Sequence, residues 1–191
     1  MTDAEVDEVR ARLEKYVGEP MGLPAVAPDP VNVPMIRHWV DALDDRNPVY
    51  LDEGFAATSR FRGIVAPPAM LQTWTMLRPR IQGIAERGGA PDEIDFDNPI
   101  KALDKEGYVG TLATNSELEF VRYLRPGDHL RVESRVESIS NRKATALGRG
   151  YFVTWGMTYR TGDGEVVGRQ LFRVLKFDPR TIDPSRPGAV R

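Results

Sequence analysis

The sequence predicts an α+β fold in which helices come first and an antiparallel sheet follows. In the first half, apolar residues such as Val6, Val9 and Leu13 recur at helical spacing. From Tyr108 onward the period changes to two, and residues 151–159 alternate as a half-buried strand does. Turn sequences join these later segments, as in an antiparallel meander. Such a sheet has one apolar face, and we expect the preceding helices to cover it.

The helical half is punctuated by caps and prolines. A capping box of Thr2 and Glu5 begins the first helix, and Gly18 is placed to end it. Four prolines exclude regular structure between residues 19 and 30. Pro34 suits the first turn of a second helix. The predicted helices cover residues 2–17, 34–43, 53–59 and 69–77.

The last of these helices has few charges and two prolines at its start, so we expect it to be buried nearly all round. Pro79 limits it, and residues 88–97 read as a polar loop. The predicted strands cover residues 111–123, 129–138, 151–159 and 166–177, with turns at residues 125–128, 141 and 161–164.

The composition excludes several classes of function. The chain has 191 residues, which suits one domain with extensions, and no cysteine, so disulfides, thiolate metal sites and a cysteine nucleophile are absent. Its two histidines, His38 and His129, cannot form a histidine-rich metal centre. A net charge of −2 argues against nucleic acid as a partner. There is no secretory leader and no apolar run of about 20 residues for a membrane, so we expect a cytoplasmic protein.

The hexapeptide at residues 45–50, Asp-Arg-Asn-Pro-Val-Tyr, resembles the aspartate-x-asparagine-proline-x-histidine signature of the MaoC-like, R-specific enoyl-CoA hydratases. Further matching segments follow in the order of that family, and the resemblance reaches from about Asp29 to Pro179. It implies a hot-dog fold, a curved antiparallel sheet wrapped around a long central helix. The matching segments lie at residues 29–32, 35–40, 63–70, 74–76, 107–110, 113–115, 123–128 and 175–177.

Within this family, the chain is most similar to the MaoC-like domain of the larger subunit of actinobacterial steroid side-chain enoyl-CoA hydratases. The resemblance implies an N-terminal helix and connector at residues 1–30, a hot-dog domain at residues 31–179 and a tail at residues 180–191. In that family the larger subunit continues into a domain that docks an aldolase. This chain stops at Arg191, so we expect it to be the hot-dog part alone.

The resemblance also implies a division of labour. A small hot-dog partner supplies the catalytic aspartate and histidine, the larger subunit shapes the pocket for a bulky steroid side-chain 2-enoyl-CoA, and two copies of each make a heterotetramer. The coenzyme A thioester is the substrate, so neither a cofactor nor a metal is expected.

Tyr50 is the departure from the family pattern. Hydration of an enoyl thioester needs a base that activates water. The pKa of a tyrosine is near 10 and that of a histidine is near 6.5. The difference of about 3.5 units corresponds to about 5 kcal/mol, by which a tyrosine is the poorer general base. We therefore expect no catalytic residue in this chain and a degenerate motif at Asp45, Asn47 and Tyr50. The plainer interpretation is that Asp45 caps a turn and Tyr50 packs.

Substrate contacts are expected around the start of the central helix, where backbone N–H groups can bind a thioester oxygen. Met70 and Trp74 on this helix can face an apolar ligand, although core packing explains them as well. Two polar residues that interrupt the first strand can face the pocket or the partner. The predicted substrate-binding residues are Gly63, Ile64, Val65, Ala66, Met70, Trp74, Thr114 and Asn115.

Two other functions stay open at this point. Because Asp45 is present, the chain could be a self-sufficient hydratase that acts as a homodimer. Because the histidine is missing, it could instead be a module that binds acyl-CoA or docks an aldolase without taking part in a reaction.

Overall fold

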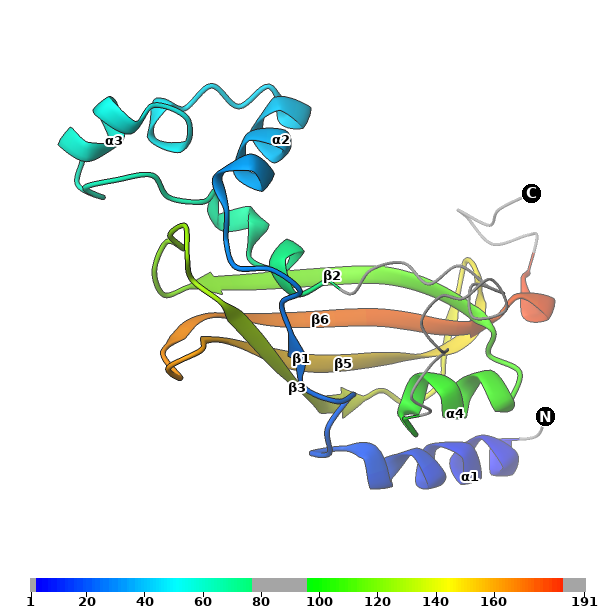
Figure 1. The fold of residues 1–191 in the computed structure, drawn as a ribbon. Coiled ribbons are helices and arrows are strands. Elements are labelled where there is room, and N and C mark those ends of the chain that lie inside the picture. Colours follow the sequence, from blue (N-terminus) through cyan, green and yellow to red (C-terminus); the bar gives the residue numbers. More distant parts are fainter. Residues whose placement is uncertain (1–2, 77–95, 184–191) are drawn as a thin grey trace, which may run out of the picture.

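The computed structural model describes residues 3–76 and 96–183, which form a sheet with helices on one of its faces and beyond one of its ends (Figure 1). This confirms the α+β order. The helices are α1 (Asp3–Leu13), α2 (Val33–Leu43), α3 (Glu53–Thr58) and α4 (Pro99–Lys105), and short 3-10 turns include η1 (Glu14–Tyr16), η2 (Pro48–Tyr50), η3 (Pro68–Met70), η4 (Thr73–Thr75) and η6 (Pro179–Thr181).

The strands form a six-stranded antiparallel sheet in the order β1-β3-β5-β6-β2, with β4 paired to one end of β5. They are β1 (Ala25–Val26), β2 (Gly110–Phe120), β3 (Leu130–Ile139), β4 (Lys143–Thr145), β5 (Gly148–Thr161) and β6 (Val166–Asp178). The four predicted strands are therefore confirmed, with no end shifted by more than three residues, and β5 extends beyond its predicted segment at both ends. Strands β5 and β6 form a hairpin, whereas β2 pairs with β6 instead of β3, so the expected meander is wrong at this edge of the sheet.

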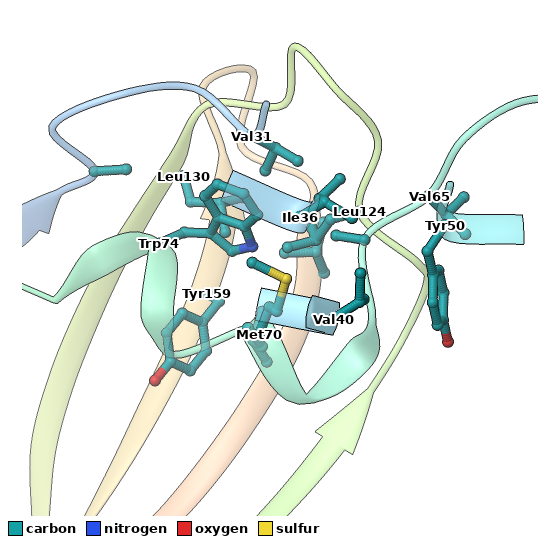
Figure 2. Close-up of a cluster of buried hydrophobic side chains, with 14 of the residues drawn as sticks. Val31, Ile36, Val40, Tyr50, Val65, Met70, Trp74, Leu124, Leu130 and Tyr159 are labelled. Atoms are coloured by element: carbon teal, nitrogen blue, oxygen red, sulfur yellow. The ribbon is translucent and has the colours of Figure 1, made fainter. Parts of the chain in front are cut away.

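Two hydrophobic clusters cover one face of this sheet, which we call the covered face. At one end, Val9 and Leu13 of α1 and Leu103 of α4 pack on Tyr151 and Val153 of β5. At the other end, a cluster around Met70 and Trp74 packs on the sheet and on α2 (Figure 2). Alternate side chains point to the opposite side, which we call the outer face. In Figure 1, α2 and α3 project beyond one end of the sheet, and α1 and α4 lie near the other end.

Strand β2 is an edge of the sheet, and all of its residues except Gly110 are exposed or nearly so. Leu112, Leu118 and Phe120 keep between 39% and 46% of their surface exposed. An unpaired edge strand of this length is a template for pairing with another chain.

The predicted central helix is wrong over its described part. Residues 68–76 form the two 3-10 turns η3 and η4 with a bend between them, because Met70 N–H and Thr75 N–H reach back only three residues, to Pro67 O and Gln72 O. The predicted helix end at Pro79 and most of the polar loop at residues 88–97 lie outside the described residues, as does Thr2 of the predicted capping box.

The structure also contains elements that the sequence analysis missed. Helix α4 begins at Asn98, whose side chain accepts a 3.0 Å hydrogen bond from Lys101 N–H, followed by proline in the first turn. The proline-rich connector is not free of regular structure, since Ala25 and Val26 pair with β3 and Pro20 bridges to Arg135. Among the described residues, no helix has the length and apolar character needed to cross a membrane.

Candidate functional site

The signature loop is held together by its own polar side chains. Helix α2 ends at Asp44, which adopts a left-handed conformation with φ of 51°. The next carboxylate, Asp45, accepts a 3.1 Å hydrogen bond from Asn47 N–H through Oδ1. Asn47 Oδ1 in turn accepts a 3.2 Å bond from Val49 N–H and caps η2. Asp45 and Asn47 therefore shape the turn, as the plainer interpretation of these residues stated.

The Tyr50 side chain packs in the apolar cluster, and the Asp45 carboxylate lies near enough to influence its phenol. Only 7% of the tyrosine's surface is exposed. Figure 2 shows it at the margin of the cluster beside Val65, with its hydroxyl directed away from Met70 and Trp74. Burial raises the pKa of the Tyr50 phenol, and Tyr123 and the Asp45 carboxylate add to this effect. A raised pKa keeps the hydroxyl protonated, so Tyr50 is an even poorer base than an exposed tyrosine.

The histidines do not replace the missing base in the signature loop. His38 is exposed on α2. His129 is exposed as well, and its Nε2 lies 2.8 Å from Ala27 O, where the connector passes β3.

Some of the backbone N–H groups that were predicted to bind the thioester oxygen already donate hydrogen bonds within the protein. Gly63 N–H donates to Ala56 O at 2.9 Å, and Ala66 N–H donates to Leu124 O at 2.8 Å. Only Ile64 and Val65 of this predicted segment therefore keep N–H groups without a backbone acceptor among the described residues. Gly63 has a φ of 151°, a conformation that favours glycine, so its role in the turn is structural.

The other predicted substrate-binding residues fall into two places. Met70 and Trp74 are buried in the same cluster as Tyr50, with 0% and 3% of their surfaces exposed. Trp74 Nε1 is buried and has no hydrogen-bond partner in the part of the chain that the structure describes. Thr114 and Asn115 lie instead at a bulge in the edge strand β2, where Thr114 Oγ1 donates to Arg173 O at 3.2 Å. The structure thus separates these two residues from the signature loop.

Between the two clusters, the covered face carries a strip of six side chains that the sequence analysis missed, of which Gln170 is buried and the other five are at least partly exposed. Cross-strand register places its members in two adjacent rows over β2, β6 and β5. Trp155 and Phe172 meet edge to face with ring centroids 5.1 Å apart, which provides an apolar floor. We call this strip the middle band, and it consists of Ser116, Leu118, Trp155, Met157, Gln170 and Phe172.

A buried polar network lies within the middle band. Tyr159 O–H donates a 2.7 Å hydrogen bond to Gln170 Oε1, and both residues are at most 2% exposed. Gln170 Nε2 donates to Ser116 Oγ at 2.9 Å and to Gln72 Oε1 at 3.2 Å. The signal in the sequence was a glutamine that alternates with Phe172 and Val174 on the inward face of β6, where a buried polar group needs a hydrogen-bond partner.

A hollow of about 720 Å³ is lined by none of the predicted site residues, although Leu118, Met157 and Gln170 of the middle band contribute to its lining. Most of its lining side chains occupy positions that alternate with those of the middle band and therefore belong to the outer face. Gly156 lies within it beside the Glu137 side chain, and its walls carry further charged residues such as Glu133 and Arg169. Its charged walls make it a poor site for a bulky apolar acyl group.

Comparison with known proteins identifies the family. Residues 17–170 match the family model described as "FAS1-like, dehydratase domain region". The chain is 45% identical over 188 residues to a "probable enoyl-CoA hydratase alpha subunit" of Thermomonospora curvata, covering 97% of this chain and 57% of that protein. It is 41% identical over 164 residues to the "3-oxo-4,17-pregnadiene-20-carboxyl-CoA hydratase alpha subunit" of Mycobacterium tuberculosis, covering 86% of this chain and 50% of that protein. The chain thus spans about half the length of these relatives.

Solved structures agree with the sequence matches. A chain in the crystal structure of the ChsH1-ChsH2 complex from Mycobacterium tuberculosis is 38% identical and superimposes with a TM-score of 0.74, covering 92% of this chain and 98% of that chain. A MaoC-like dehydratase from Rhodospirillum rubrum, with 23% identity, a TM-score of 0.55 and coverage of 85% and 92%, shares the fold alone. These neighbours confirm the predicted hot-dog fold.

Proposed function

Since this chain belongs to the FAS1-like dehydratase family, we propose that it is one hot-dog subunit of a heteromeric enoyl-CoA hydratase. In this proposal a small MaoC-like partner supplies the aspartate and histidine that add water to the double bond. This chain supplies part of the pocket for a bulky, steroid-type acyl group. The relatives named as hydratase alpha subunits, and the neighbour solved as a complex, support a role beside a second subunit.

The main support for this proposal is the arrangement of Asp45 and Tyr50 in the signature loop. The carboxylate of Asp45 is engaged by Asn47 N–H, and Tyr50 is buried with a raised pKa. Neither group is arranged to take a proton from water near neutral pH, and general acid–base catalysis accounts for about 10²–10⁴-fold of such a reaction. A chain that keeps the family fold but lacks the base fits the role of a pocket-forming subunit.

The middle band supports a bulky acyl group. Its half-exposed aromatic and thioether side chains lie where a hot-dog fold usually places its central helix, and the described part of that segment is two short turns. An apolar surface with a few polar groups is typical of a ligand site. The steroid class comes from the printed substrate of one relative, and it belongs to the proposal for this chain.

We place the small partner subunit at the edge of the sheet formed by β2. No strand among the described residues pairs with the outer side of β2, and Leu118 and Phe120 expose apolar surface beside it. Pairing with a strand of the small subunit would extend the sheet and bring the partner's active site next to the middle band. We place the aldolase contact outside this hot-dog domain, because the relatives are about twice as long.

A reconstitution experiment tests the proposal. Hydratase turnover of 3-oxo-4,17-pregnadiene-20-carboxyl-CoA is measured with this chain, with a small MaoC-like subunit that has the intact aspartate and histidine, and with both. We expect robust turnover only in the mixture. The matched variant is Asp45→Asn, which keeps an acceptor for Asn47 N–H, and it should change turnover of the mixture by less than about twofold. Robust turnover by this chain alone, abolished by Asp45→Asn, would overturn the proposal.

A further inference from the structure

The hydrogen bonds of the Gln170 network run in one direction. Burial raises the pKa of the Tyr159 phenol, so this hydroxyl keeps its proton and donates it to Gln170 Oε1. Gln170 Nε2 then faces Ser116 and Gln72 and donates both of its hydrogens to them. Ser116 Oγ and Gln72 Oε1 act as acceptors in these two bonds.

This arrangement leaves two donors at the end of the network. The hydroxyl hydrogen of Ser116 and the amide hydrogens of Gln72 have no acceptor among the described residues. Both side chains touch the same nitrogen within 3.2 Å, so they lie close together. Ser116 is exposed and Gln72 is partly exposed, whereas Tyr159 and Gln170 behind them are buried. The buried pair therefore fixes the orientation of two donors at the surface of the middle band.

The surroundings of these donors are apolar and uncharged. Leu118 is the cross-strand neighbour of Gln170 on the same face, and Met76 follows η4, with 39% and 60% of their surfaces exposed. The neighbouring acidic residues of β2, Glu117 and Glu119, belong to the outer face by alternation. Two neutral donors beside apolar side chains suit a neutral oxygen acceptor on an apolar body. They lack the positive charge that a carboxylate or phosphate would require.

We propose that Ser116 and Gln72 form a specificity subsite that binds a ketone oxygen on the acyl body, at the end remote from the thioester, with Gln170 and Tyr159 as positioning residues. The inference rests on the proposed function, in which the small subunit handles the thioester end. A relative's printed substrate carries such a group, the 3-oxo function, at the opposite end of the ring system from the carboxyl-CoA.

Binding rather than turnover tests the subsite. The probe is 3-oxo-4-pregnene-20-carboxyl-CoA, in which the double bond to be hydrated is saturated, and the comparison ligand lacks the ring ketone. Both are titrated calorimetrically into the chain with and without the small subunit. We expect Ser116→Ala to raise the Kd of the keto ligand about three- to tenfold, the range for one neutral hydrogen bond. The Kd of the ketone-free ligand should stay unchanged.

Three further variants sharpen the test. Ser116→Thr keeps the hydroxyl and should retain most of the affinity for the keto ligand. Glu117→Gln, on the same strand but on the outer face, is the matched control and should change neither Kd. Tyr159→Phe should lower the preference for the keto over the ketone-free ligand, a ratio that a general loss of stability would not move.

The outcomes separate the subsite from the proposed function. An equal loss for both ligands in Ser116→Ala would mean that the donors meet the thioester carbonyl, and it would overturn the assignment. An unchanged Kd, or no binding of the keto ligand by the wild-type protein, would overturn it as well. Hydratase turnover is measured in parallel, and its absence would count against the proposed function while the ratio of Kd values still decides the subsite.

Discussion

Lys176 of β6 donates a 2.5 Å hydrogen bond to Asp104 of α4, although only 1% of the lysine residue's surface is exposed. Its Nζ also donates to Thr111 Oγ1 on β2 at 2.8 Å. One buried ammonium thus joins a helix, the central part of the sheet and the edge strand where we place the partner. A charge taken out of water is tolerated only when it is paired and hydrogen-bonded, so this contact fixes the position of α4.

Asp104→Asn should destabilise the protein, because it leaves the Lys176 ammonium buried without a counter-charge. Breaking a buried pair costs about 3–5 kcal/mol, and the partial exposure of Asp104 reduces this to about 1–3 kcal/mol. Lys176→Met removes the buried charge itself and should cost less. Urea unfolding measures both variants. The exposed pair Arg169–Glu119 provides the control, and Glu119→Gln should cost under about 1 kcal/mol. A larger loss for Lys176→Met than for Asp104→Asn would contradict this reasoning.

Tyr151→Phe should stabilise the protein by about 1 kcal/mol, because the Tyr151 hydroxyl is buried and makes no hydrogen bond of ordinary geometry among the described residues, although the Tyr108 side chain lies beside it. Burial also raises the pKa of this phenol. Because the folded-state pKa is raised, the contribution of this phenol to stability is fully present below its unfolded-state pKa, which is near 10. That contribution is lost as the pH rises above this value. Unfolding measured between pH 9 and pH 11 should therefore show a shallower loss in Tyr151→Phe than in the wild type. Equal slopes would show that another group is responsible.

Gly150→Ala should destabilise the protein by about 2–3 kcal/mol, because a Cβ at this position would overlap the backbone oxygen of Lys176 on the neighbouring strand. Backbone cannot move aside as a flexible side chain can. Gly22→Ala is the matched control, since nothing lies within 4 Å of its added Cβ. Thermal and urea unfolding of the two variants should differ clearly. A Gly150→Ala protein as stable as Gly22→Ala would be inconsistent with the observed strand register.

Leu118→Lys should weaken binding of the small subunit at least about tenfold, because it places a charge in an apolar contact beside the edge of β2. Its folding should change little, since Leu118 is 39% exposed. Leu23→Lys, at a 52% exposed position in the connector, is the control and should bind normally. Sedimentation with increasing partner concentration measures both affinities. Unchanged binding by Leu118→Lys would place the partner at a different surface.

Tyr50→Phe should leave the turnover of the reconstituted complex within about twofold, because the phenol acts neither as base nor as a ligand contact in this proposal. Tyr50→His should not make the chain active alone, since Asp45 already accepts a bond from Asn47 N–H and the position is buried among apolar side chains. Stopped assays at several pH values measure both variants. Substantial turnover by Tyr50→His alone would show that only the base was missing.

The sequence by itself determined the order of the elements, the four main strands and the family. These follow from local spacing: a period of two marks half-buried strands such as residues 151–159, and the loop at residues 45–50 keeps its motif. The tyrosine at the position of the family's histidine predicted a degenerate motif, with simple packing of Tyr50 as the plainer interpretation, and the phenol is buried. Local signals also exist for α4, because Asn98 followed by Pro99 is a standard helix start.

Only the tertiary structure decided which side chains meet. Gln170 contacts Ser116 and Gln72 across 54 and 98 residues, and Lys176 reaches Asp104 across 72. No local pattern encodes such pairs, because they depend on strand register and on the turns that replace the expected helix at residues 68–76. Register also placed Thr114 and Asn115 at the edge of the sheet, away from the signature loop. The physical reason is that periodicity fixes which face a side chain occupies, whereas its neighbours on that face are set by the packing of distant segments.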